Sequence, residues 1–310
     1  MIVMSIKPTR LQMGDTIGIV TLGSPLNSIS INRGVGILEN MGFNVVLGKY
    51  VYNNEGYLST SEERRAEDLM TMFENPNVKA IIPTRGGVGV AGILPYLDYN
   101  IIRQNPKIIT GYSDITILLN VLYKIVDLIT FHSLLLIDFK EDTPIYNYNG
   151  FFSATTSTTA PRDLNNPEGI PLYGNNLGII SAPVVGGNLS SFIDNLGTPY
   201  EIDTKGKILF LEEVHEPINK VYRYINHLKL AGKFEDCVGI IMGECTGCNE
   251  AYGKTYENLL DEVILRFNKP TITNLASGHG YYKATIPIGA EIRMNTFNST
   301  LTILEPTVSL

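Results

Sequence analysis

The first half of the sequence alternates short, β-branched apolar segments with longer segments that carry apolar residues at helical spacing. The strand-like segments are residues 16–22, 43–47, 78–83, 107–110 and 127–131. Runs of this length and composition are typical of buried strands. Strands that are separated by helices predict a parallel sheet with helices on both faces. Ligands of such sheets bind beyond the carboxyl ends of the strands.

The intervening segments have recognisable helix ends. Residues 29–41 place Ile31, Val35 and Leu38 on one face and stop at Gly42, a typical C-terminal cap. Residues 60–63 (TSEE) resemble a capping box that opens the next helix. We therefore expect a doubly wound α/β arrangement in this half of the chain.

The alternation stops near residue 140. Residues 140–176 are rich in Ser, Thr, Pro and Asn without clear periodicity, which predicts a linker or long loop. Strand-like segments then predominate, and they are interrupted by two helical segments; the strands are 179–185, 207–212, 238–243, 291–294 and 300–304, and the helices are 217–230 and 254–267. We expect two domains, residues 1–150 and a strand-rich α+β domain at 177–310, joined by a linker at 151–176.

Charge and composition limit the class of partner. The 310 residues include 24 Lys and Arg against 31 Asp and Glu, a net charge of −7. This sign argues against a nucleic acid or an anionic membrane as the main partner. The apolar start of the chain stops at Lys7, and the apolar run 128–137 is shorter than a membrane span. Three cysteines do not suggest a disulfide framework, so we expect a cytoplasmic protein.

Ser113 is the sharpest candidate nucleophile. It lies in residues 109–116 (ITGYSDIT), where a strand ends at Thr110 and a helix is expected to begin near Asp114. A tight strand-to-helix turn exposes the hydroxyl beside backbone N–H groups that can stabilise an oxyanion. The alternative is that Ser113 only caps the helix, because Ser is a preferred N-cap residue.

A second candidate element is Arg85–Gly86–Gly87, which follows the third predicted strand. Adjacent glycines allow close approach of a ligand and offer N–H donors, and Arg85 could bind a substrate carboxylate. The alternative is an ordinary turn.

The second half offers a carboxylate and a histidine. Glu212 and Glu213 end an intensely apolar strand, where a carboxylate requires a partner or a solvated strand end. His279 lies between glycines in a loop suited to presenting its side chain, whereas His132 follows a strand of the first half. Chain context alone favours His279 over His132 only weakly.

Cys245 and Cys248 form a Cys-x-x-Cys pair without the further ligands that a zinc site needs. We interpret them as structural thiols and predict neither a metal site nor a redox function.

Taken in order, these segments resemble the LD-carboxypeptidase family of serine peptidases, and within it the MccF-like branch of microcin C immunity proteins. The matching segments are residues 14–20 (GDTIGIV), 85–87 (RGG), 94–98 (LPYLD), 111–116 (GYSDIT), 186–189 (GGNL), 197–200 (GTPY), 209–213 (LFLEE), 278–279 (GH) and 287–289 (PIG). Each is weak by itself, but the ordered set is specific and spans nearly the whole chain.

The resemblance implies a flavodoxin-like N-terminal domain that supplies the nucleophile Ser113 and a smaller C-terminal domain that supplies the acid Glu212 and the base His279. It also implies oxyanion donors at the backbone N–H groups of Asp114 and the Gly86–Gly87 turn. No cofactor or metal is expected. We expect a homodimer that acts on a small peptide or a peptidyl nucleotide.

Alternative functions remain open at this point. The substrate could be a murein tetrapeptide or a microcin-like aminoacyl nucleotide. The chain could instead be a non-catalytic binding module of the same fold. A glutamine amidotransferase would need a cysteine where Ser113 stands.

Overall fold

The computed structural model describes residues 5–310; residues 1–4, part of the apolar start discussed above, lie outside the described residues. The chain divides into two compact units. Unit 1 holds the residues up to Thr158, together with Thr285–Gly289 and Pro306–Leu310, and unit 2 holds Thr159–Ala284 and Ala290–Glu305. The chain therefore passes between the units after residues 158, 284, 289 and 305.

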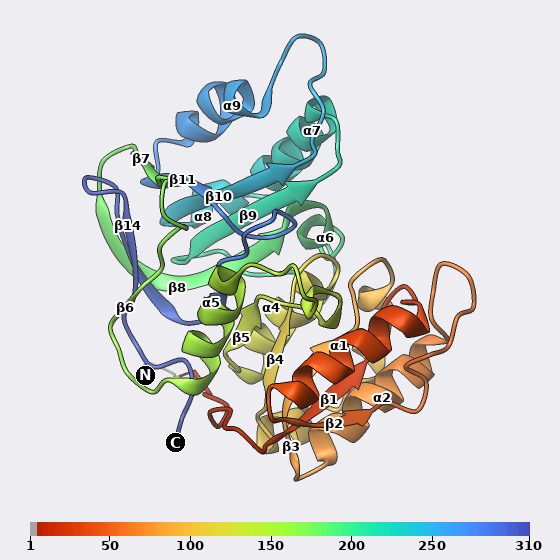
Figure 1. The fold of residues 1–310 in the computed structure, drawn as a ribbon. Helices are drawn as coiled ribbons and strands as arrows, with labels where there is room; N and C mark the ends of the chain where they lie inside the picture. Colours follow the sequence, from red (N-terminus) through yellow and green to blue (C-terminus); the bar gives the residue numbers. More distant parts are fainter. Residues whose placement is uncertain (1–4) are drawn as a thin grey trace. The chain divides into compact units, whose positions relative to one another are not determined.

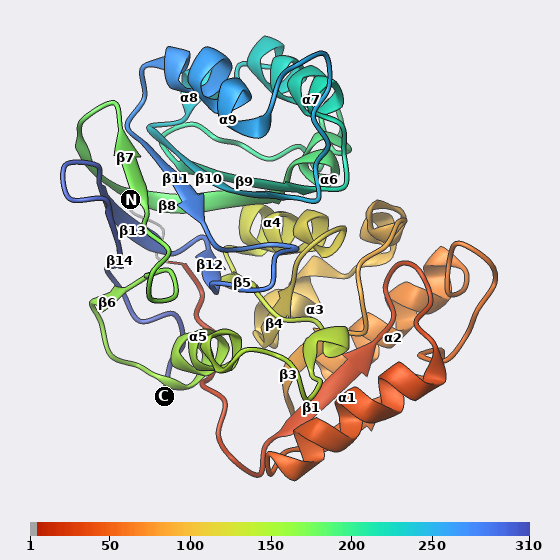
Figure 2. The ribbon, with the colours of Figure 1, turned by 45° about the horizontal axis from the view of Figure 1, so that its top comes forward.

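Unit 1 is built on a six-stranded sheet with the order β12-β5-β4-β3-β1-β2. Figure 1 labels β1 to β5, and Figure 2 labels β12 beside β5. Its strands are β1 (Thr16–Val20), β2 (Asn44–Leu47), β3 (Val78–Pro83), β4 (Ile108–Gly111), β5 (Thr130–His132) and β12 (Ile286–Ile288). The first five are parallel, which confirms the expected arrangement. β12 was not predicted; it pairs antiparallel with β5 through Ile286 and His132.

Helices cover both faces of this sheet (Figure 2). They are α1 (Ser28–Asn40), α2 (Glu62–Glu74), α3 (Tyr99–Gln104), α4 (Ile115–Val126) and α5 (Ile145–Thr156), with short 3-10 turns at Val90–Tyr96 and Leu136–Asp138. The connection from β1 to β2 runs along the sheet in one direction. The three later connections, from β2 to β3, from β3 to β4 and from β4 to β5, run in the opposite direction. Because such crossovers are right-handed, α1 lies on one face and α2 to α4 lie on the other.

The helix ends follow the sequence signals closely. Asn27 caps α1 by accepting a hydrogen bond from Ser30 N, and Ser61 caps α2 by accepting one from Arg64 N. These caps satisfy backbone donors that the first helical turn leaves without partners.

Unit 2 contains an eight-stranded sheet with the order β6-β14-β13-β8-β9-β10-β11-β7. Its strands are β6 (Arg162–Asp163), β7 (Tyr173–Asn175), β8 (Ile179–Asn188), β9 (Ile208–Val214), β10 (Gly239–Thr246), β11 (Thr271–Leu275), β13 (Glu291–Asn295) and β14 (Thr300–Ile303). β8 to β11 are parallel to one another, and the outer strands pair antiparallel. The carboxyl ends of β9, β10 and β11 therefore meet at one edge.

One face of the parallel strands of unit 2 is covered by helices (Figure 2). These are α6 (Leu189–Ile193), α7 (Ile218–Leu230), α8 (Lys233–Asp236) and α9 (Tyr256–Leu259), the last continued by a π turn at Leu260–Ile264 and a 3-10 turn at Leu265–Phe267. In α7 the residues Ile218, Val221, Ile225 and Leu228 are all buried, as their spacing predicts. Each fully buried side chain of this size contributes about 1.5–3 kcal/mol. Within residues 5–310 no helix combines the length and apolar character needed to cross a bilayer.

The predicted linker at 151–176 is wrong in its first part, because α5 extends through residue 156. This helix lacks an amphipathic pattern and contains Gly150, so periodicity does not reveal it. Tertiary packing stabilises it instead: the Phe151 ring meets that of Phe139 edge to face, the Phe152 ring stacks on that of Phe43, and Leu11 N donates to the Thr155 carbonyl at 2.8 Å. The two-residue and three-residue strands β6 and β7 interrupt the remainder.

Candidate active site

Ser113 lies on the turn between β4 and α4 in unit 1. Its backbone φ is 60°, and that of Gly111 is 152°. A left-handed conformation costs a non-glycine residue roughly 1–2 kcal/mol. Such conformations cluster at functional turns that direct a side chain outward. The predicted strand-to-helix turn is therefore present with the backbone geometry of a nucleophile-bearing turn.

The alternative role of Ser113 as a helix cap does not hold. The N-cap of α4 is Asp114, and its side chain makes no capping hydrogen bond. The Asp114 carboxylate instead accepts a hydrogen bond from Val90 N at 2.8 Å. Asp114 thus ties the start of α4 to the loop after β3.

That loop carries Arg85, Gly86 and Gly87 directly beside Ser113. A methyl group added to Gly86 would lie 2.9 Å from Ser113 Oγ and 3.0 Å from Asp114 N, so only glycine fits. Gly87 has a φ of 88°, which favours glycine as well. Among the described residues, none accepts a hydrogen bond from the N–H groups of these two glycines. Both donors are therefore available to a ligand at the Ser113 hydroxyl.

Arg85 is half-buried at the start of the loop. Within residues 5–310 no side chain forms an ion pair with it. A half-buried guanidinium without a counter-charge can bind a carboxylate with paired N–H donors.

Arg65 holds this region together, although no local sequence pattern predicts that role. It is fully buried, and it donates through Nε to Thr60 O at 3.1 Å and through Nη1 to Leu22 O at 2.5 Å and Gly89 O at 2.8 Å. Burial lowers the pKa of Arg65. In the EERR segment it looks like an exposed helix residue, and only the tertiary structure shows that it anchors the glycine loop.

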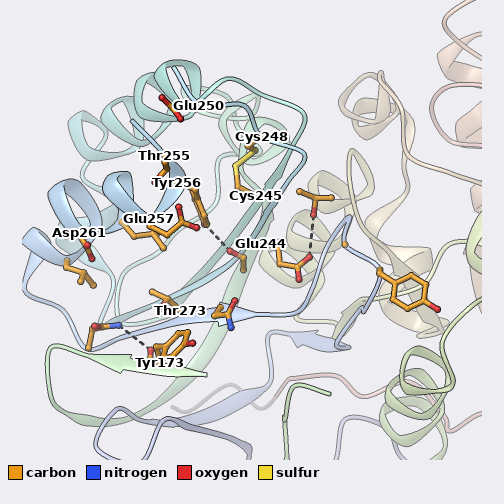
Figure 3. A pocket seen from close by; sticks show the side chains of 18 residues that line it. Tyr173, Glu244, Cys245, Cys248, Glu250, Thr255, Tyr256, Glu257, Asp261 and Thr273 are labelled. Carbon is orange, nitrogen blue, oxygen red and sulfur yellow. Dashed lines mark hydrogen bonds between the residues drawn. A yellow bond between two sulfur atoms is a disulfide. The ribbon is translucent and has the colours of Figure 1, made fainter. Parts of the chain in front are cut away.

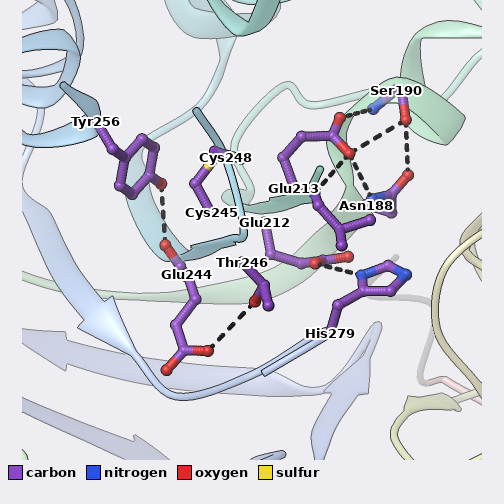
Figure 4. The surroundings of a disulfide bond; sticks show 12 residues. Asn188, Ser190, Glu212, Glu213, Glu244, Cys245, Thr246, Cys248, Tyr256 and His279 are labelled. Atoms are coloured by element: carbon purple, nitrogen blue, oxygen red, sulfur yellow. Dashed lines mark hydrogen bonds and ion pairs between the residues drawn. A yellow bond between two sulfur atoms is a disulfide. The ribbon is translucent and has the colours of Figure 1, made fainter. Parts of the chain in front are cut away.

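Unit 2 brings Glu212 and His279 together. His279 Nδ1 lies 2.9 Å from Glu212 Oε2, with 15% of the His279 side chain exposed and none of the Glu212 side chain (Figure 4). Glu212 Oε1 is buried and accepts no hydrogen bond from the described residues. The carboxylate therefore directs its interaction to the imidazole, and it can stabilise an imidazolium that forms there.

Glu213, the neighbouring carboxylate, has a different role. It accepts hydrogen bonds from Asn188 Nδ2 at 3.1 Å, Ser190 N at 2.9 Å and Val214 N at 2.9 Å (Figure 4). Burial raises the pKa of Glu213. Successive side chains of β9 point to opposite faces, so Glu212 reaches the histidine and Glu213 anchors the start of α6.

The remaining histidines lie elsewhere. His132 is buried on β5 of unit 1, with its ring 6.4 Å from that of Tyr112. His215 and His227 are exposed. The structure thus pairs Glu212 with His279, the histidine that chain context favoured weakly.

The interpretation of Cys245 and Cys248 as structural thiols is wrong in their redox state, because the two form a disulfide (Figure 4). Cys245 lies near the end of β10 and Cys248 in the turn that follows (Figure 3), with their Cα atoms 5.4 Å apart, which is within the ordinary range for a disulfide. Cys237 is the free cysteine, and burial raises the pKa of its thiol to about 11. In the described part of the chain no group of three or more His, Cys, Asp or Glu side chains could hold a metal ion.

Comparison with known proteins adds independent findings. A family model described as the LD-carboxypeptidase N-terminal domain matches residues 17–133, and one described as the LD-carboxypeptidase C-terminal domain matches residues 181–294. The chain is 34% identical to a "probable murein peptide carboxypeptidase" of Bacillus subtilis over 305 residues, which covers 96% of this chain and 94% of that one. It is 31% identical to the microcin C7 self-immunity protein MccF of Escherichia coli, covering 96% of both chains.

A solved structure shows the same likeness. The microcin C7 self immunity protein MccF in complex with aspartyl sulfamoyl adenosine superimposes with a TM-score of 0.90 at 29% identity, covering 98% of this chain and 100% of that chain.

Proposed function

Because this chain belongs to the LD-carboxypeptidase family of serine peptidases, we propose that it hydrolyses an amide bond with Ser113 as nucleophile, His279 as base and Glu212 as the acid that orients the base. The observation that carries the proposal is the 2.9 Å contact between His279 Nδ1 and the buried Glu212 carboxylate. An imidazole held in this way keeps its Nε2 available to accept a proton.

The reaction proceeds in two halves. His279 Nε2 takes the Ser113 hydroxyl proton as Oγ bonds to the amide carbonyl carbon. The N–H groups of Asp114 and the Gly86–Gly87 turn stabilise the oxyanion that forms. The C–N bond then breaks, and His279 returns the proton to the leaving amine. A water molecule, deprotonated by His279, attacks the carbonyl carbon of the acyl-serine. The C–Oγ bond then breaks, His279 returns the proton to Ser113 Oγ, and the acid is released.

The proposal requires a residue of unit 1 to react with a pair held by unit 2. The contact between His279 and the buried Glu212 carboxylate supports catalysis over the alternative of a non-catalytic binding module. A module that only binds has no need for such a pair. The left-handed backbone of Ser113 supports the same choice.

For the substrate, we propose a small peptide or a peptidyl nucleotide. Relatives include a murein peptide carboxypeptidase, and MccF has been solved with aspartyl sulfamoyl adenosine. Arg85 favours a peptide with a free terminal carboxylate, because it lies beside the glycine loop without an ion-pair partner among the described side chains. The murein tetrapeptide is therefore the first substrate to test.

The test compares the unaltered protein with Ser113→Ala on two substrates, a murein tetrapeptide and an aspartyl sulfamoyl adenosine, with products followed by mass spectrometry. We expect the unaltered protein to cleave one of them and Ser113→Ala to lose at least about a thousandfold in rate. Ser28→Ala, at an exposed serine on the first turn of α1, is the matched control. Undiminished turnover by Ser113→Ala would rule out the serine mechanism.

We also propose that the protein is cytoplasmic and homodimeric. The net charge of −7 and the family resemblance support a soluble enzyme of small substrates. The Cys245–Cys248 disulfide does not support a reducing location. Cell fractionation and light scattering of the purified protein test the two statements separately.

A further inference from the structure

Arg65 is a cation of unit 1 with no exposed surface. It lies in α2, its exposed fraction is 0%, and within residues 5–310 no carboxylate forms an ion pair with it. Arginine is almost never fully buried without such a partner, because burial of an unpaired charge is costly. The position of Arg65 therefore depends on the hydrogen bonds that its guanidinium makes to the surrounding backbone.

These hydrogen bonds all go to backbone carbonyl groups. Nη1 donates to Leu22 O at 2.5 Å, just after β1, and to Gly89 O at 2.8 Å, in the loop that follows β3. Nε donates to Thr60 O at 3.1 Å, just before α2. One planar side chain thus joins three loops that are far apart in the sequence.

The glycine loop (residues 85–89) lies directly against the guanidinium. A methyl group added to Gly89 would lie 3.3 Å from Arg65 Nη1 and 2.5 Å from Leu58 Cδ2. Gly89 also has a φ of 98°, a conformation that side chains other than hydrogen rarely adopt. The end of the glycine loop is therefore placed by Arg65 itself and not by a side chain of the loop.

The peptide group between Gly89 and Val90 is held from both sides. Its carbonyl accepts from Arg65, and its N–H donates to Asp114 Oδ2 at 2.8 Å. Asp114 is 5% exposed, so the cation and the anion are both buried. Hydrogen bonds to charged groups are stronger than neutral ones, and the peptide group is a rigid plane. Its orientation relative to the start of α4 is therefore fixed.

This orientation matters for the N–H groups of Gly86 and Gly87. None of the described residues accepts a hydrogen bond from either, so bonds at neighbouring residues must fix their direction. Ser24 N donates to Gly86 O at 3.2 Å on one side, and the held peptide group lies on the other. A donor to an oxyanion must lie about 2.7–3.1 Å from that oxygen, so a small shift of the loop removes its effect.

We propose that Arg65 is a positioning residue for catalysis. Acting through the peptide group between Gly89 and Val90, it holds the Gly86 and Gly87 N–H groups at the place where the oxyanion forms beside Ser113. The inference rests on the proposed function, because it takes these N–H groups to stabilise the oxyanion of that reaction. A guanidinium suits this role because its N–H donors lie in one rigid plane.

The kinetic test compares Arg65→Met and Arg65→Lys with the unaltered protein, on whichever of the two substrates above the unaltered protein cleaves. We expect kcat to fall about a hundredfold in Arg65→Met with KM unchanged, because misplaced donors are missed only when the oxyanion forms. Arg65→Lys should lose less, because an ammonium can still donate to some of the three carbonyls.

The matched control is Lys107→Met. Lys107 is also a buried cation of unit 1, and its Nζ donates to the carbonyls of Asn75 and Val78, each at 2.6 Å. These residues lie at the amino ends of β3 and β4, whereas Ser113 follows the carboxyl end of β4. Lys107→Met should therefore keep the kcat of the unaltered protein. The inference is overturned if both Arg65 variants keep that kcat, or if Lys107→Met loses as much as Arg65→Met.

Thermal melting shows which variants are folded, and Arg65→Lys decides the outcome if Arg65→Met is not. A rise in KM with kcat unchanged would also overturn the inference, because it would place Arg65 in substrate binding rather than in oxyanion stabilisation.

Hydrogen exchange of the Val90 amide tests the same role without turnover, by NMR of protein labelled with 15N-valine. We expect exchange at least about tenfold faster in Arg65→Met, an intermediate rate in Arg65→Lys and no change in Lys107→Met, because only the Arg65 variants release the held peptide group. Unchanged exchange in both Arg65 variants overturns the inference. Faster exchange in a protein that cleaves neither substrate counts against the proposed function but leaves the hold of Arg65 on the glycine loop standing.

Discussion

His279 lies between two glycines, each of which packs against a carboxylate. Gly278 has a φ of 89° and faces Glu212, and Gly280 faces Glu244. Side chains at these positions would push both carboxylates away from the loop. The loop therefore leaves no room for a side chain on either side of the histidine, because a carboxylate packs against each flanking glycine.

Gly278→Ala should affect both stability and catalysis. The positive φ alone costs an alanine roughly 1–2 kcal/mol of unfolding free energy, and the added methyl also displaces the Glu212 carboxylate. We expect kcat to fall about a hundredfold, because small displacements of a catalytic group have effects of that size. Urea unfolding and steady-state kinetics measure the two effects.

Gly206→Ala is the control for this prediction. Gly206 has a φ of 70° with nothing within 4 Å of an added methyl, so it carries the backbone cost alone. Equal kcat values for the two variants would show that Glu212 does not depend on the space at Gly278.

At this scale the sequence predicted the residues that a motif names, but not those that only packing selects. Ser113, Glu212 and His279 were predicted because ordered motifs bracket them, and their joint role remains a proposal. Arg65 was not predicted as part of a site, because it has no local signal. Arg65 matters because it donates hydrogen bonds to backbone carbonyl groups of three separate loops.

At the scale of elements, the prediction succeeded where local pattern and tertiary context agree. Strands β1 to β5 coincide with short β-branched apolar segments and helix α7 has a clear helical period, and the structure contains all of them. α5 was missed because contacts with other parts of unit 1 stabilise it rather than its own pattern. β12 has three residues, and only its pairing with β5 identifies it as a strand.

The Cys245–Cys248 disulfide should stabilise the turn after β10 modestly. It closes a loop of only four residues, and the loss of chain entropy in the unfolded state corresponds to about 2 kcal/mol for a loop of this length. The double variant Cys245→Ser/Cys248→Ser should therefore unfold in urea with a free energy lower by that amount. A fall above about 4 kcal/mol would indicate that the disulfide supports more than its own turn.

Lys107, just before β4, makes stability depend on alkaline pH. It is 6% exposed, and its Nζ donates to Asn75 O and Val78 O, each at 2.6 Å. Burial lowers its pKa from 10.5 to about 8. Between pH 8 and pH 10.5 the unfolded chain binds more protons than the folded chain, because Lys107 loses its proton earlier in the folded state. The contribution of Lys107 to the free energy of unfolding therefore rises with pH over this range. Below about pH 8 this contribution is constant.

We therefore compare the unfolding free energies of the unaltered protein and Lys107→Met at about pH 7.5 and about pH 10.5. Relative to the variant, the unaltered protein should gain up to about 3 kcal/mol over this range. The variant Lys229→Met, at an exposed position of α7, corrects for the loss of one charge. A difference that stays level across this range would contradict the assignment.

At the scale of the whole molecule, the two units are not consecutive pieces of chain. Unit 1 takes β12 from the middle of the stretch that builds unit 2, and it takes the last five residues as well. Those residues are firmly held: Thr307 Oγ1 donates to Ala154 O at 2.7 Å, Arg10 N donates to Ser309 O at 2.9 Å, and Val308 is 1% exposed.

A chain that ends at Glu305 should lose about 4 kcal/mol of unfolding free energy, from one buried valine and three hydrogen bonds, the third from Ser309 N to Pro8 O at 2.9 Å. Urea unfolding measures the loss. Removal of Leu310 alone, which is 84% exposed, should change the unfolding free energy by less than about 0.5 kcal/mol. Equal stability of the two truncated chains would show that the terminal segment does not support unit 1.

The insertion of β12 also limits how such a chain can be recombined. A chimaera that joins two relatives at a single point after residue 158 would place a strand of foreign origin at the edge of the first parent's N-terminal sheet, opposite His132. To exchange unit 2 while leaving unit 1 native, an engineer must return to the first parent for residues 285–289 and again from residue 306. Modular exchange in this architecture therefore takes four junctions rather than one.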